Sequence, residues 1–165
     1  MTLADDRRAA KTLKSDETER LVAYEDDPYT WALQQAEFLL KGRLDLIDAA
    51  KLADEIAALA HDLADKLRSD LSRVLQHLLK WDHQPQMRTR SWALSIEEHR
   101  RRVTQHLAGG SGLRSILPGL LAEAYVDGRR HALDETGLPR AALPTTCPYT
   151  WDEIMSRPID WPEPL

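Results

Sequence analysis

The sequence contains a single cysteine, Cys147, and has no long apolar run. One cysteine excludes an intramolecular disulfide and a zinc site built from several cysteines. The apolar runs fall far short of the ~20 residues that cross a bilayer, and the N-terminus lacks the apolar core of a secretion signal. Glycine-rich phosphate loops, Gly-x-Ser-x-Gly elbows and His-Glu-x-x-His are absent. We therefore expect a cytoplasmic protein with no membrane segment and no cofactor.

The composition is that of a soluble globular protein. Of 165 residues, 42% are hydrophobic and 30% are charged, and the net charge is -5. Neither a two-residue strand period nor an internal repeat is present, which favours an all-α fold. Positive charge gathers in residues 80–102, where six Lys or Arg residues stand against three acids. Only this segment suggests contact with an anionic partner.

A helical bundle around one long central helix is the predicted architecture. Asp27-Pro28 and Gly42 carry the start and stop signals of a first helix. From about residue 45 to residue 82, apolar residues recur every three or four positions, which indicates one long amphipathic helix. The stripe consists of Leu52, Ile56, Leu59, Leu63, Leu67, Leu71, Val74, Leu78 and Trp81.

Proline and glycine then divide the rest of the chain. Pro85 ends the long helix, and Ser91 is the expected N-cap of the next one. Pro118 is expected to end a short turn and begin a further helix, which stops at Gly137. A proline-rich extended segment follows, and the Thr150 to Glu153 spacing predicts a capping box for a short terminal helix. We divide the chain into an N-terminal extension, residues 1–23, expected to be a weakly ordered or loosely docked helix, and a single helical domain, residues 24–165.

A set of short blocks follows in a specific order and spacing: Tyr29-Thr30-Trp31, Gln35-Ala36, Gly42-Arg43, Leu52 to Ile56, His77 to Trp81, Gln84-Pro85, Ser91-Trp92, Ser95-Ile96, Glu135 to Pro139, Cys147-Pro148 and Thr150. Together these blocks resemble a bacterial family known as domain of unknown function 29. The resemblance covers about residues 24–163 and implies an α-helical bacterial protein, without any activity, substrate or catalytic residue. The sequence departs from the family pattern at Ala142 and at Asp82-His83.

The corner between the long helix and the next one is the first candidate site. A half-buried His77 with Asp70 and Trp81 as neighbours could serve as a general acid or base. The basic residues could instead hold a phosphate or nucleic acid beside the tryptophans. We favour a structural interpretation, in which His77 packs on Trp81 and makes one hydrogen bond. The candidate anion or ligand rim consists of Asp70, His77, Lys80, Trp81, Arg88, Arg90, Ser91 and Arg100.

A second candidate is the spacing of Glu123, Asp127 and His131, which stand one helical turn apart. Such a row can hold a divalent metal in a bundle, but it lacks the Glu-x-x-His pairs of di-iron proteins. Salt bridges explain it better. His99 and His106 lie two turns apart, too far for one ion without a third helix, and are expected at the edge of the apolar stripe.

These patterns favour a non-catalytic helical interaction module that binds a protein partner or assembles with itself. The motivation is a well-patterned core combined with the lack of any complete catalytic set. A phosphate or nucleic-acid binding protein, or an enzyme using residues 77–102, is the alternative, and a metal-binding hydrolase is a weaker one. No membrane partner is expected.

Overall fold

A computed structural model of the protein describes residues 21–160 and confirms the all-α fold, with no strand in that range. The chain forms two compact units, the first ending at Ala57 and the second beginning at Ala58. Most of the expected extension, residues 1–23, lies outside the described residues, and the proposed domain division stays a prediction. The helices are α2 (Pro28–Lys41), α3 (Ala49–His83), α4 (Arg90–Ala108), α5 (Gly112–Thr136) and α6 (Trp151–Ser156), with 3-10 turns at Leu44–Leu46, Pro85–Met87 and Arg140–Ala142.

In the first unit, α2 begins and ends at the expected residues. The Asp27 carboxylate accepts a hydrogen bond from the Thr30 amide, and Gly42 adopts the left-handed conformation with φ 68°. The side chains of Trp31 and Phe38 are buried. A 3-10 turn follows, so α3 starts at Ala49, later than the expected residue 45, and the Asp48 carboxylate accepts from the Lys51 amide.

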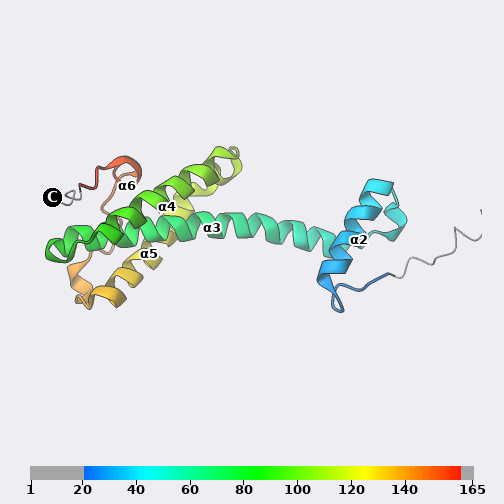
Figure 1. Ribbon diagram of the computed structural model, residues 1–165, viewed down its shortest axis with the longest axis horizontal. Coiled ribbons are helices and arrows are strands. Elements are labelled where there is room, and N and C mark those ends of the chain that lie inside the picture. Colours follow the sequence, from blue (N-terminus) through cyan, green and yellow to red (C-terminus); the bar gives the residue numbers. More distant parts are fainter. Residues whose placement is uncertain (1–20, 161–165) are drawn as a thin grey trace, which may run out of the picture. The chain divides into compact units, whose positions relative to one another are not determined.

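In the second unit, α4 and α5 lie alongside the C-terminal part of α3 (Figure 1). This part of α3 supplies most of the core, because its apolar stripe is fully buried from Leu67 onward. The same stripe is uncovered on the N-terminal side, where Leu59 is 59% exposed and Leu63 is 42% exposed. The predicted stripe is thus core over only part of its length.

At Gly128, which is buried, the backbone of α5 lies close against the backbone of α3. A Cβ atom at this position would lie 2.7 Å from the Ser72 carbonyl oxygen and 3.2 Å from the Leu75 Cβ. Only a glycine therefore permits this separation between the two helix backbones.

The C-terminal segment is bound to the helices through its backbone carbonyl groups. Arg129 of α5 donates to the carbonyl oxygens of Arg140 and Pro144, at 2.6 and 2.7 Å. Arg100 of α4 donates from all three guanidinium nitrogens to carbonyl oxygens of the terminal segment, which belong to Glu153, Ile154 and Arg157. The predicted capping box of α6 is present, with Thr150 and Glu153 bonded in both directions.

Two of the expected helix boundaries were wrong. Helix α4 is capped by Thr89, whose hydroxyl accepts from the Trp92 amide, and Ser91 lies inside the first turn. Pro118 does not start a helix, because α5 runs through it without interruption from Gly112. Proline removes the hydrogen bond to the carbonyl four residues earlier, and that residue, Arg114, is exposed, so water can replace the lost donor.

No helix within residues 21–160 combines the length and apolar composition needed to span a membrane.

Candidate functional site

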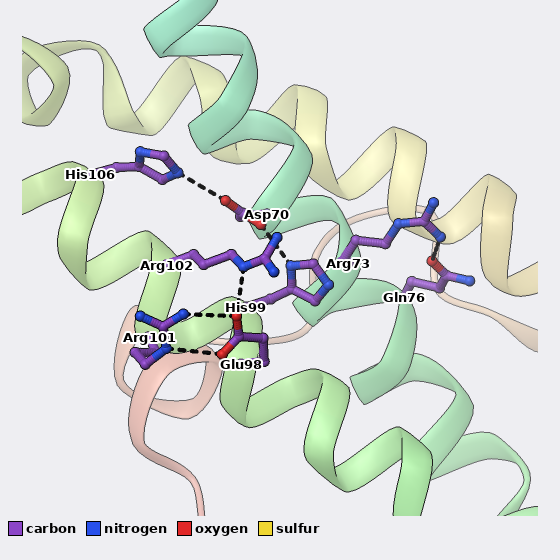
Figure 2. A network of polar contacts seen from close by, with 8 residues as sticks. All are labelled: Asp70, Arg73, Gln76, Glu98, His99, Arg101, Arg102 and His106. Carbon is purple, nitrogen blue, oxygen red and sulfur yellow. Dashed lines mark hydrogen bonds and ion pairs between the residues drawn. The ribbon is translucent and has the colours of Figure 1, made fainter.

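The polar contact between α3 and α4 is centred on one buried carboxylate. Asp70 is 8% exposed, and each of its oxygens is bound to a different histidine of α4 (Figure 2). The Oδ1 atom lies 2.6 Å from His99 Nδ1, and Oδ2 lies 2.9 Å from His106 Nε2. We call these three residues the Asp70 junction. It is the most buried carboxylate arrangement of the second unit, because the other acids of its ion pairs are more exposed.

The chemistry of a carboxylate fixes the state of both rings. An ionised carboxylate only accepts hydrogen bonds, so His99 Nδ1 and His106 Nε2 must each carry a hydrogen. In their neutral forms the two rings therefore keep the opposite nitrogens, His99 Nε2 and His106 Nδ1, as acceptors. Asp70 thus orients two imidazoles, an arrangement that can position a base or stabilise the contact between the helices.

Helix geometry explains why both histidines reach one carboxylate. His99 and His106 are seven residues apart on α4 and share its buried side with Ile96 and Val103. Two turns of an α-helix advance the chain by roughly 11 Å. Asp70 projects between them from the facing helix, so that each ring meets one oxygen. The spacing was visible in the sequence, but it was interpreted as an edge of the apolar stripe.

Beside the Asp70 junction lies a hollow of about 320 Å³, which we call the α3–α4 hollow. Arg102 on its wall donates from Nε to Glu98 at 2.8 Å, and Arg101 binds the same carboxylate through two nitrogens. These hydrogen bonds lower the pKa of Glu98 to about 2. The hollow is lined by Lys66, Ser69, Asp70, Arg102, Gln105 and His106.

Residues of the candidate rim form hydrogen bonds and ring contacts away from Asp70. Lys80 is buried, donates to Glu135 Oε2 at 2.6 Å, and lies 4.2 Å from the centre of the Trp92 ring. Its hydrogen bond lowers the pKa of Glu135. Arg88 lies over the Trp81 ring, 4.8 Å from its centre, and donates from Nε to the Trp81 carbonyl oxygen. These cations stabilise the corner between α3 and α4.

Three other members of the rim also lie apart from Asp70 and His77. Arg100 is committed to the C-terminal segment, and the Ser91 hydroxyl lies 2.8 Å from the Thr89 hydroxyl at the exposed start of α4. Arg90 is exposed at the same helix end. Within residues 21–160, no hydrogen bond or ion pair joins Arg90 or Arg100 to Asp70 or His77. The structure therefore brings Asp70 together with His99 and His106, and not with the rim.

His77 lies near Lys80 and Glu135, with its Nδ1 atom buried and without a hydrogen-bond partner. The hydrogen bond expected for it is not formed to any described residue. Burial, followed by the positive charge of Lys80, lowers the pKa of His77 from 6.5 to about 4. The negative charge of Glu135 raises the pKa of His77, whereas His99 and Arg73 lower it further.

This pKa shift predicts a pH-dependent loss of stability. Between pH 6.5 and about pH 4 the unfolded chain binds a proton at His77 that the folded chain does not, so the free energy of unfolding falls as the pH falls. The contribution of His77 to the free energy of unfolding is fully present above pH 6.5. At most about 3 kcal/mol of it is lost as the pH falls to about 4. Urea denaturation across this window should show a smaller pH slope for His77→Leu than for wild type. Equal slopes would contradict the prediction.

In the row on α5, Glu123 and Asp127 form ion pairs and His131 forms a hydrogen bond. Arg68 of α3 lies 2.9 Å from Asp127 and 3.9 Å from Glu123, and Arg130 lies 2.9 Å from His131 Nε2. In the part of the chain that the structure describes, no group of three or more His, Cys, Asp or Glu side chains is placed to hold a metal ion.

Fold and site together define an all-α helical domain with a carboxylate-bridged pair of histidines between two of its helices. A family model described as "Domain of unknown function DUF29" matches residues 23–159, and the chain belongs to this family. Neither the curated proteins nor the solved structures contain a match to the chain.

Proposed function

We propose that the protein is a non-catalytic helical interaction module, which associates with a second copy of itself through the exposed turns of α3. The observation that carries this proposal is the exposure of Leu59 and Leu63 on the helix whose apolar stripe is buried from Leu67 onward. A stripe that continues the core pattern without a covering element is typical of an interaction surface. The bacterial origin implied by the resemblance and the cytoplasmic location expected from the sequence belong to the same proposal.

The spacing of these side chains supports α3 of a second copy as the partner that binds this surface. Leu59 and Leu63, both in the second unit, are four residues apart, as neighbouring d and a positions of a coiled coil are. Ala60, next to Leu59, leaves room for a close helix contact.

The expected affinity is low, because the exposed segment is short. Full burial of one Leu or Ile side chain contributes roughly 1.5–3 kcal/mol. A few such side chains from each copy produce a gross gain of the same order as the cost of association, about 4–15 kcal/mol. We therefore expect self-association that depends on concentration in the micromolar range.

Sedimentation velocity over a range of micromolar concentrations tests this prediction. Wild type should shift from monomer to dimer as the concentration rises, and Leu59→Glu should remain monomeric because it places a charge in the contact. Leu94→Glu is the matched control, since Leu94 is 51% exposed but lies on α4. A wild type that stays monomeric, or a control that dissociates as Leu59→Glu does, would refute self-association.

The phosphate and nucleic-acid alternative at residues 77–102 has less support. The donors of Lys80, Arg88 and Arg100 are committed to Glu135, to the Trp81 carbonyl and to the C-terminal segment. The metal-binding hydrolase alternative has no support, because Asp127 of α5 pairs with arginines.

A further inference from the structure

We propose that the α3–α4 hollow binds the phosphoryl group of a small phosphate monoester. The hydrogen-bond donors of the hollow are other residues than those of the rim considered above, although Asp70 belongs to both, and the proposal does not depend on self-association through α3. Its basis is a concentration of hydrogen-bond donors from two helices around one opening: Lys66 and Ser69 from α3, and Arg102 and Gln105 from α4.

The donors around the hollow are mostly uncommitted. Among residues 21–160, Lys66, Ser69 and Gln105 form no side-chain hydrogen bond or ion pair with one another or with a neighbour. Among the described residues, Arg102 donates only to Glu98, and it does so from Nε. The two terminal nitrogens of its guanidinium can therefore donate to another acceptor. Figure 2 shows this guanidinium extending from α4 toward Asp70. An added anion would therefore gain hydrogen bonds without breaking existing ones.

The charge balance at the hollow favours an anion. Each of the two nearby carboxylates is already engaged, Asp70 by two histidine rings and Glu98 by two arginines. Among the lining residues, Lys66 and Arg102 carry two positive charges against the one negative charge of Asp70. The surplus is positive even when both histidines are neutral.

The number and kind of donors favour a phosphoryl group over a carboxylate. A carboxylate presents two oxygens in one plane, whereas a phosphoryl group presents three oxygens that helices on two sides can reach. An arginine fork and a lysine ammonium are the side chains that proteins commonly use for phosphate oxygens. The hydroxyl of Ser69 and the amide of Gln105 supply neutral donors.

A neighbouring hollow supplies room for the organic part of the ligand. It measures about 410 Å³ and shares Gln105 and His106 with the α3–α4 hollow. Leu63 and Leu113 provide apolar walls, and Gly109, Gly110 and Gly112 keep the wall at the α4–α5 connection free of side chains. A monoester with a compact apolar or aromatic group would fill both hollows.

Titration of the full chain with inorganic phosphate and with phenyl phosphate, followed by amide NMR shifts at constant ionic strength, tests the proposal. We expect both ligands to shift Ser69 and Gln105, and phenyl phosphate to bind more tightly. Lys66→Gln and Arg102→Gln should each weaken binding at least tenfold. Lys41→Gln, which removes a lysine paired with Glu37 on α2, should bind as wild type does.

Several outcomes would overturn the proposal. Equal affinity of all variants would show unspecific attraction to positive charge, and shifts that avoid Ser69 and Gln105 would show another location. If phenyl phosphate binds no more tightly than inorganic phosphate, the proposal of a monoester ligand is refuted and the hollow is a site for free phosphate. Leu59→Glu should keep wild-type phosphate affinity, so the failure of self-association and the failure of this site are measured separately. Thermal unfolding confirms that each variant is folded.

Discussion

Replacing Gly128 with alanine is expected to lower the free energy of unfolding by about 3 kcal/mol. The new methyl group would lie 2.7 Å from the Ser72 carbonyl oxygen and 3.1 Å from the Gln76 amide nitrogen, so the α5 and α3 backbones must separate. Both contacts are to backbone atoms within a helix, which cannot rotate away as a side chain would. Separation also loosens the packing of buried Ala124 and Ala132 on the same side of α5.

Helix α5 offers a matched control for this substitution at Gly119. No atom lies within 4 Å of a Cβ built at that glycine, so alanine there is expected to stabilise the helix by roughly 0.5–1 kcal/mol. Urea denaturation should give the two variants opposite shifts in midpoint with unchanged m values. Equal stability of Gly128→Ala and wild type would show that α5 does not pack against α3 at this distance.

Replacing Asp70 with alanine is expected to cost about 2–4 kcal/mol of stability. The change removes the acceptor of both His99 and His106 at once, and hydrogen bonds to a charged group contribute more than neutral ones. The histidine side chains are 20% and 23% exposed, so water can compensate part of the loss, which keeps the expected cost below that of a fully buried pair. The measurement is the urea midpoint at neutral pH.

Two further variants separate the hydrogen bonds of Asp70 from its charge. Asp70→Asn should cost clearly less than Asp70→Ala, because its carbonyl oxygen accepts from one ring and its amide can donate to the other ring in the alternative tautomer. Asp62→Ala, at an exposed position of the same helix, should change stability by no more than about 0.5 kcal/mol. If Asp70→Ala is as stable as wild type, the Asp70 junction does not hold α3 and α4 together.

The parts of the fold that depend on local backbone chemistry were predicted from the sequence. Asp27 and Gly42 bound α2, and Thr150 with Glu153 forms the capping box of α6, because these hydrogen bonds join residues three or four positions apart. The expected family membership is confirmed as well. At Ser91 and Pro118 the local signals were ambiguous. Thr89 was an equally good cap two residues earlier, and an exposed carbonyl made the proline tolerable inside α5.

The candidate site was predicted only in fragments. The helical spacing indicates Asp70 as a candidate, but it predicts His77 as the partner because both lie on one edge of the same helix. The actual partners are 29 and 36 residues away in the chain, and no pattern within one helix specifies them. The basic residues of the corner were noticed for their charge, and the structure shows that Lys80 and Arg100 use that charge for internal hydrogen bonds.

The sequence by itself determined that the chain is helical, where α2 to α5 end, where α2 and α6 begin, and which side of α3 is apolar. Only the tertiary structure decided that this side is buried from Leu67 onward and exposed at Leu59 and Leu63, that Gly128 lies against the α3 backbone, and that two histidines share Asp70. The physical reason is one of range. Caps and periodicity act within one or two turns, whereas burial and partner choice depend on where other helices lie along α3.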